Sequence, residues 1–235
     1  MTYIDPNIIR MKSRIKSVPK KPAAKRAYDS TSRRERAEAT RQAILTASRE
    51  IFTEKGYAGT TMPSIAQSAG IALDTVYASV GKKPALFALL VETAISGTDV
   101  AIPAAERDYV RAIRAEPAPA RKLAIYAAAL RSIQERLAPL FRVLQEAAPL
   151  DPALGEMWNR IAERRAKNMR LLAQELAATG QLQRGLSIEM AADILWSMNS
   201  PEYYLLLVEQ RGWKPEALEQ WLSEAWCRLL LKKAE

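Results

Sequence analysis

Histidine is absent from this sequence of 235 residues, and cysteine occurs once, at Cys227. The lack of histidine removes the most common general base and metal ligand, together with every Ser–His or Cys–His nucleophile pair. A single cysteine cannot form an intrachain disulfide or a thiolate zinc site. These absences count against most enzyme classes, and we expect no catalytic residue, cofactor or metal.

Long hydrophobic runs are also missing. No apolar stretch reaches the roughly 18 residues of a membrane-spanning helix, and the opening MTYIDPNIIRMKSRIKSVPKK lacks the apolar core of a secretory signal. The chain is nevertheless 49% hydrophobic and long enough to bury a core. We therefore expect a globular, cytoplasmic protein without a membrane partner. Because strand pairs, hairpin dipeptides and internal repeats are lacking, the predicted fold is all-α, with nine or ten helices.

Positive charge is concentrated at the front of the chain. Residues 1–41 carry 12 of the 35 Lys and Arg but only four of the 26 Asp and Glu, so the remainder is nearly neutral. Residues 1–31, which include Pro6, Pro19 and Pro22, are predicted to be a flexible basic arm. Such an arm suits a polyanion, because each phosphate contact releases counterions. The alternative, a solubilising leader without a partner, stays open.

A first helix is predicted over residues 33–55. Ser32 and Glu35 have the spacing of a capping box, and Gly56 can end the helix in a left-handed conformation. Further along, the segment from Thr61 to Val80 contains two short helical patterns separated by Gly70. Helices this short are marginal alone, so their persistence indicates that an exposed face is needed.

These two short helices fit a helix-turn-helix over residues 61–80. Thr61 is a good N-cap, and Val76 and Val80 face inward on the second helix. In such a unit the second helix enters the major groove of DNA, and the first helix crosses the backbone. A fourth helix begins near Pro84 and ends near Gly97. Further helices are predicted over 121–137, 139–147, 153–180, 187–212 (bent near Pro201) and 214–233.

Residues 38–98 resemble the DNA-binding domain of the TetR/AcrR family of transcriptional regulators. The resemblance implies a helical ligand-binding and dimerisation domain over residues 99–235, whose last helices resemble the family more weakly. The matching residues are Ile44, Leu45, Ala47, Phe52, Gly56, Tyr57, Thr60, Thr61, Ile65, Ala66, Ala69, Gly70, Thr75, Val76, Tyr77, Lys83 and Leu86.

The resemblance also implies the DNA contacts. Phosphate contacts fix the register of a protein on DNA, whereas contacts with base edges specify sequence. The expected DNA-binding residues are Thr61, Leu73, Asp74, Thr75, Tyr77, Ser79 and Lys83. This chain departs from the family pattern at 72–74: Ala72 cannot cap the recognition helix, and Asp74 can favour the helix dipole or accept from a cytosine amine. Alternatively, Tyr77 only packs, and Lys82 is a solvated charge.

A homodimer is expected through the last two helices. Their apolar stripes must be buried by something, although an intrachain core can account for part of them. The expected dimer interface consists of Met190, Ile194, Met198, Leu218, Trp221, Leu222, Ala225 and Leu229. Two-fold symmetry would place two recognition helices about 34 Å apart on a pseudo-palindrome.

A ligand pocket is expected among the helices between residues 103 and 210. Arg165 is an unusual member of an otherwise apolar stripe. The predicted lining is Tyr126, Phe141, Trp158, Arg165, Trp196 and Asn199. The alternative is that these aromatic residues are core and that Arg165 pairs with a Glu at the rim.

The resemblance thus implies a DNA-binding transcriptional regulator, more often a repressor. It would bind a pseudo-palindromic operator in double-stranded DNA as a homodimer, and a small-molecule effector would release it. Two alternatives stay open: an all-helical enzyme with a substrate cavity, and a ligand-independent protein that uses the helix-turn-helix for tethering to DNA.

Overall fold

The computed structural model describes residues 24–98 and 100–233, with side chains from residue 31 onward. The chain divides into two units, residues 1–39 and 40–235. Within the described residues there are ten α-helices, and the one pairing of extended backbone is an isolated bridge between Leu182 and Leu231. The predicted all-α class is confirmed.

The first helix, α1 (Ala24–Gly59), begins earlier than predicted, so Ser32 lies inside the helix and not at its N-cap. Residues 24–31 of the predicted arm are therefore helical, and residues 1–23 lie outside the described residues. Gly56 interrupts α1 with φ +68° and ψ 179°. The positive φ expected of a terminating glycine is present, but the ψ angle is extended and not left-handed helical.

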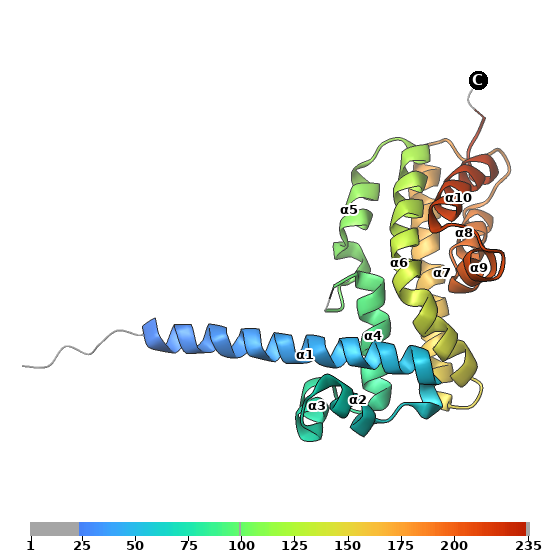
Figure 1. Ribbon diagram of the computed structural model, residues 1–235. Coiled ribbons are helices and arrows are strands. Elements are labelled where there is room, and N and C mark those ends of the chain that lie inside the picture. Colours follow the sequence, from blue (N-terminus) through green and yellow to red (C-terminus); the bar gives the residue numbers. More distant parts are fainter. Residues whose placement is uncertain (1–23, 99, 234–235) are drawn as a thin grey trace, which may run out of the picture. The chain divides into compact units, whose positions relative to one another are not determined.

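Three further helices complete the N-terminal part: α2 (Met62–Ala69), α3 (Leu73–Val80) and α4 (Lys83–Ser96). Figure 1 shows α2 and α3 next to each other, with α4 leading from them toward the long helices that follow. The predicted boundaries hold here because each end has a local signal, such as left-handed Gly70 and Gly97.

The remaining helices form a bundle (Figure 1). They are the 3₁₀ turn η1 (Ala104–Glu106), α5 (Asp108–Ala115), α6 (Pro119–Ala147), α7 (Pro152–Ala178), α8 (Ile188–Met198), α9 (Pro201–Tyr204), the π-helix η2 (Leu205–Gln210) and α10 (Pro215–Leu230). The break predicted near Pro201 is present, with Ser200 as N-cap of α9.

The start of α1 is not the only boundary that was predicted wrongly. Pro139 does not separate two helices, because α6 continues through it to Ala147. Proline removes one helical hydrogen bond and costs about 3 kcal/mol in a helix interior. The buried Leu137 and Ala138 before it, and Leu140 and Phe141 after it, hold both halves of α6 against the core. Packing on both sides thus outweighs the local cost.

Two buried clusters organise residues 40–235. The first contains residues of α1–α4 together with the C-terminal half of α6 and the start of α7. The second contains α5, the N-terminal half of α6, the end of α7 and the last helices. Helices α6 and α7 therefore contribute to both clusters and connect the helix-turn-helix with the C-terminal bundle.

Candidate nucleic-acid interface and internal cavity

Helix α2 is fixed at its start by a reciprocal cap. The backbone N–H of Ser64 donates to Thr61 Oγ1 (3.2 Å), and the N–H of Thr61 donates to Ser64 Oγ (3.2 Å). This arrangement satisfies two backbone donors that a helix N-terminus otherwise leaves unpaired. The predicted N-cap is confirmed, and the exposed Thr61 side chain stands at the positive end of the α2 dipole.

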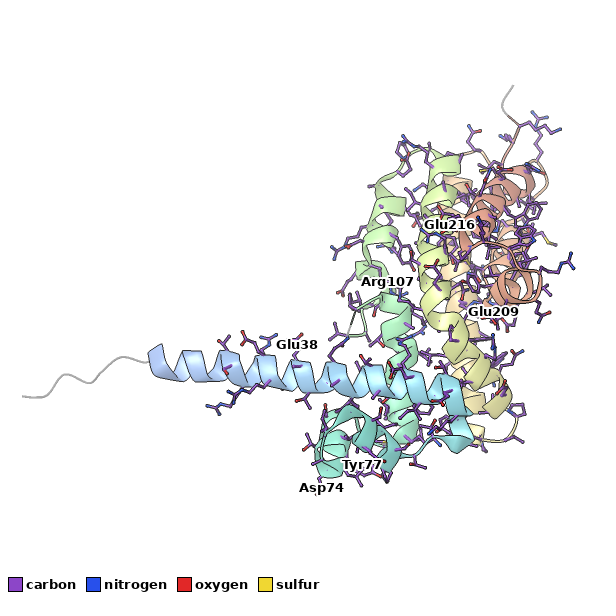
Figure 2. All side chains as sticks on the ribbon, in the orientation of Figure 1. Glu38, Asp74, Tyr77, Arg107, Glu209 and Glu216 are labelled. Carbon is purple, nitrogen blue, oxygen red and sulfur yellow. The ribbon has the colours of Figure 1, made fainter. Side chains whose placement is uncertain are left out.

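Helix α3 divides into a buried and an exposed face. Val76 and Val80 are buried in the first core cluster, as predicted. Asp74, Thr75 and Tyr77 are exposed, and Tyr77 keeps 42% of its surface open to solvent. Figure 2 shows Asp74 and Tyr77 together on α3. An exposed row of polar and aromatic side chains on a short, firmly backed helix is what groove recognition requires.

The two other residues predicted on α3 are less open. Leu73 is half-buried and packs against the first core cluster, so its side chain contributes mainly to the fold. Ser79 is also half-buried, and its carbonyl accepts a long hydrogen bond from Arg41 Nη1 of α1 (3.4 Å). Ala72 gives no side-chain cap, as its chemistry predicts, and Asp74 lies in the first turn of α3.

Lys83 lies at the start of α4, with its Nζ 4.2 Å from the centre of the Tyr57 ring. Tyr57 stacks with Phe52 and meets Phe87 edge-on, so the ring beneath the ammonium is held in place. Burial lowers the pKa of Lys83, and the nearby Asp151 carboxylate acts in the opposite direction. The Tyr57 ring thus holds the Lys83 ammonium at the start of α4.

A cavity of about 270 Å³ lies inside the C-terminal bundle. Its wall is contributed mainly by α5, α6 and α7, with Ile95 from α4 at one end and Asn199 and Pro201 at another. Most lining side chains are apolar, and a few polar groups converge among them. This composition is typical of small-molecule sites, although the volume is at the small end of their range.

Three of the six residues predicted for the pocket meet there. Arg165 donates from Nη2 to Asn199 Oδ1 (2.7 Å) and to the Trp196 carbonyl (2.7 Å). Asn199 Nδ2 in turn donates to the Tyr126 hydroxyl (2.7 Å), and Gln134 Nε2 donates to the Asn199 carbonyl (2.8 Å). Desolvation raises the pKa of Tyr126 and lowers that of Arg165.

The other three predicted residues lie elsewhere. Phe141 and Trp158 pack against each other, with ring centres 4.6 Å apart, and belong to the first core cluster. Trp196 touches Arg165 through its ring and carbonyl but does not line the cavity. Within the described residues Arg165 has no carboxylate within 4.0 Å, so the alternative of a rim ion pair to a Glu is not what the structure shows.

Sequence reasoning missed Arg107, Gln134 and Arg164, all of which line the cavity. Arg107 and Gln134 are buried, with 9% and 3% of their surface exposed. Each stands among other charged or polar residues, where it looks like ordinary helix surface. The signal that could have found Gln134 is its place on the buried stripe of α6, between Ile133 and Leu137.

The residues predicted for the dimer interface fall into two groups. Leu218, Leu222 and Ala225 are buried inside the chain. Met190, Trp221 and Leu229 are exposed, and Ile194 and Met198 are half-buried. Trp221 is held in place by a hydrogen bond from its Nε1 to the Tyr203 hydroxyl (2.8 Å) and by an edge-on contact with Trp213.

Two kinds of feature are lacking in the part of the chain that the structure describes. Helices long and apolar enough to cross a membrane were not found between residues 24 and 233. The same part of the chain holds no group of three or more Cys, Asp or Glu arranged to bind a metal.

Comparison with known proteins places the N-terminal helices in a family. Residues 44–90 match the profile of bacterial regulatory proteins of the tetR family. The predicted resemblance is therefore confirmed over residues 44–90, which include α2, α3 and the adjoining parts of α1 and α4. No curated protein matches the sequence.

Solved structures share the fold over most of the chain. NalD of Pseudomonas aeruginosa, the secondary repressor of the MexAB-OprM multidrug efflux pump, is 24% identical, with a TM-score of 0.65 over 85% of this chain and 100% of its own. FadR of Bacillus subtilis in complex with stearoyl-CoA is 19% identical, with a TM-score of 0.63 over 80% of this chain and 98% of its own. SmeT in a complex with triclosan is 20% identical, with a TM-score of 0.59 over 83% of this chain and 93% of its own.

Proposed function

We propose that this chain is a transcriptional regulator that binds double-stranded DNA as a homodimer and leaves it when a small molecule occupies the cavity. In this proposal the protein is a repressor and not an enzyme, and it acts in the cytoplasm. The observation that carries the proposal is the exposed row Asp74, Thr75 and Tyr77 on α3, above the buried Val76 and Val80.

The geometry of α2 and α3 supports the DNA contacts. The major groove, about 12 Å wide, admits one helix, and its base edges distinguish all four base pairs. Thr61 at the start of α2 and Lys83 at the start of α4 both stand at helix N-termini, where backbone N–H groups favour phosphate. We assign phosphate contacts to these two residues and base-edge contacts to Tyr77 and its exposed neighbours.

The exposed apolar side chains of α8 and α10 support the homodimer. Met190, Trp221 and Leu229 leave 54%, 37% and 46% of their surface uncovered in one protomer. Two copies related by a two-fold axis would cover these side chains against each other, and an interface of standard size buries about 1,600 Å². The dimer would then present two α3 helices to successive major grooves.

A physical connection joins the cavity to α4. Ile95 of α4 lines the cavity, and Arg164 of α7, which also lines it, donates from Nη1 to Glu92 Oε1 of α4 (2.8 Å). Arg136 of α6 donates from Nε to the Ala94 carbonyl at the end of the same helix (2.9 Å). Because α4 carries Lys83 at its other end, a ligand that moves its C-terminal turn also moves a phosphate contact.

The relatives agree with this proposal. NalD is described as a repressor, and SmeT and FadR are described in complexes with triclosan and stearoyl-CoA. For this chain a ligand binding better to the DNA-free conformation would shift the population toward it. The enzyme alternative gains no support from the cavity, whose polar groups hold one another and show no nucleophile beside a base.

The proposal is tested by fluorescence anisotropy with labelled DNA fragments from the region flanking the gene. We expect saturable binding with two protomers per site, competed weakly by unrelated duplexes. Sedimentation of the protein alone should give a dimer, and Trp221→Asp should give a monomer with native helical content. A wild-type protein that remains monomeric and ignores every flanking duplex overturns the proposal.

A further inference from the structure

The cavity has an excess of positive charge. Four arginines line it, Arg107, Arg114, Arg164 and Arg165, against a single lining carboxylate, Glu175. Charges taken out of water are costly unless they are paired and hydrogen-bonded. An arginine that has no carboxylate partner in the protein therefore indicates the charge of the ligand that the cavity can hold.

Two of the four arginines are paired. Arg164 pairs with Glu92 (2.8 Å), and Arg114 shares Glu175 with Lys122 (3.8 and 3.5 Å). Glu92 and Glu175 thus face these cations, although Glu175 Oε2 accepts no hydrogen bond. They leave little negative charge for the remaining two arginines.

Arg107, at the junction of η1 and α5, lacks such a counter-charge. Its side chain is 9% exposed, its Nε donates to the Ile102 carbonyl (3.1 Å), and no carboxylate of the described residues lies within 4.0 Å. A guanidinium carries five N–H donors, so this hydrogen bond leaves donors that can serve a ligand. Figure 2 labels Arg107 where the chain enters α5.

Arg165 is bonded, but to neutral groups, namely Asn199 and the Trp196 carbonyl. Glu202 acts on Arg165 electrostatically, but it does not form an ion pair with it within 4.0 Å. Arg165 reaches the hydroxyl of buried Tyr126 through Asn199, and Arg107 lines the same cavity, so both positive charges border the space that a ligand would occupy.

The rest of the wall is apolar. It consists of side chains such as Ile113, Leu130, Ile133, Leu137, Ile161 and Leu172. A ligand that fits this wall has a charged end and a hydrocarbon or aromatic body. A neutral apolar ligand would leave Arg107 without a counter-charge, and a cationic one would be repelled.

We propose that the cavity selects an amphipathic carboxylate, whose anionic end is held by Arg107 and Arg165 and whose apolar body lies along α6 and α7. This inference rests on the proposed function, since it names the effector class of the same cavity. Charge-assisted hydrogen bonds from Arg to a carboxylate are among the stronger polar contacts in proteins. Selectivity for the anion over its neutral isostere therefore follows from these two residues.

Isothermal titration calorimetry with the purified full-length protein tests the proposal without DNA. The probes are octanoate, 1-octanol and octylammonium, which share a chain length and differ in charge. We expect octanoate to bind at least tenfold more tightly than octanol, and octylammonium most weakly. Hexanoate and decanoate extend the comparison if the chain is too long or too short for the cavity.

Variants assign the effect to the two arginines. Arg107→Met should weaken octanoate about tenfold and leave octanol unchanged, Arg107→Lys should keep most of the preference, and Arg165→Met should act like Arg107→Met. Arg111→Met is the matched control, because Arg111 is exposed on α5 and does not line the cavity. Circular dichroism confirms that each variant is folded.

Two results overturn the proposal: octanol or octylammonium binding as tightly as octanoate, or no binding of any carboxylate from six to ten carbons. Both leave the proposed DNA regulator intact, because operator binding is measured separately. Conversely, a protein that binds octanoate selectively but no flanking DNA keeps the anion site and loses the proposed function.

Discussion

Tyr77 and Lys83 are the two residues of the proposed DNA-binding surface that are easiest to test. Tyr77 is exposed on α3 beside buried Val76, and the Lys83 ammonium lies over the Tyr57 ring. In the proposed function these residues contact DNA only in the complex, so their removal should leave stability almost unchanged. This separation of binding from folding makes them suitable for a quantitative test.

We expect Tyr77→Ala and Lys83→Ala each to weaken operator binding about tenfold, since a good contact to a base edge or phosphate contributes about 1–3 kcal/mol. Lys83→Ala should also make the slope of log affinity against log salt concentration less steep, by the amount that corresponds to about one phosphate contact. Fluorescence anisotropy at several salt concentrations measures both effects.

Lys167→Ala, which removes an exposed charge from α7, is the matched control and should have no effect. Unchanged operator affinity in both α3–α4 variants would show that DNA binds another face of the protein.

Several residues of the helix-turn-helix show where prediction from neighbouring residues in the sequence succeeds. The cap at Thr61, the left-handed Gly70 and the buried Val76 and Val80 follow from neighbours within one or two helical turns. The network of Arg165, Asn199 and Tyr126 was predicted only as a set of pocket residues, because its hydrogen bonds join positions far apart in sequence. Arg107 escaped prediction for the same reason.

Among the helices, α6 shows how tertiary packing can override a local signal. The sequence predicts a break at Pro139, yet the buried residues on both sides keep one continuous helix from Pro119 to Ala147. By contrast, the break near Pro201 is present because Ser200 caps a new helix there. A proline alone thus does not decide whether a helix ends, whereas a proline preceded by a cap is a dependable sign.

Pro139→Ala should therefore stabilise the protein. Restoring a helical hydrogen bond should raise the free energy of unfolding by up to about 3 kcal/mol. The greater conformational freedom of the unfolded variant should lower it by up to about 1 kcal/mol. We therefore expect a net increase of about 2 kcal/mol. Urea denaturation at a fixed protein concentration measures the free energy of unfolding. Since Pro139 is exposed, a loss of stability would mean that the packing of α6 requires proline at this position.

Helices α4 and α7 are joined by the Glu92–Arg164 pair, and we expect this contact to affect DNA binding. Glu92→Gln and Arg164→Gln should each weaken operator binding by up to about fivefold, the range of a partly exposed ion pair. The double variant should be no weaker than either single variant, because both changes remove one contact.

Arg160→Gln serves as the comparison, since Arg160 pairs with Glu156 on the exposed side of α7 itself. Additive losses in the double variant would indicate that Glu92 and Arg164 act through separate partners.

At the scale of the complete chain, positive charge is distributed unevenly along the sequence. Residues 1–41 hold a third of the Lys and Arg, whereas the rest of the sequence is nearly neutral. The exposed Arg34 and Arg36 of α1 belong to this segment. Composition alone predicts a basic segment here, but it does not identify the phosphates or other groups that this segment would contact.

Deleting residues 1–30 should flatten the dependence of operator affinity on salt, because each phosphate contact releases counterions. The slope of log affinity against log salt concentration, measured by anisotropy, should become less steep by an amount that corresponds to several phosphate contacts. Sedimentation should still give the same oligomer. An unaltered slope would show that these residues do not contact DNA.

Gly97, the left-handed residue that ends α4, sets a rule for relatives of this protein. Its φ is +73°, and a Cβ at this position would stand 3.0 Å from Arg136 Nη2. The arginine occupies the space that any other amino acid would need, while its Nε donates to the Ala94 carbonyl. Relatives that carry this arginine should therefore keep the glycine, because any other residue would strain the positive φ and displace the guanidinium by a few tenths of an ångström.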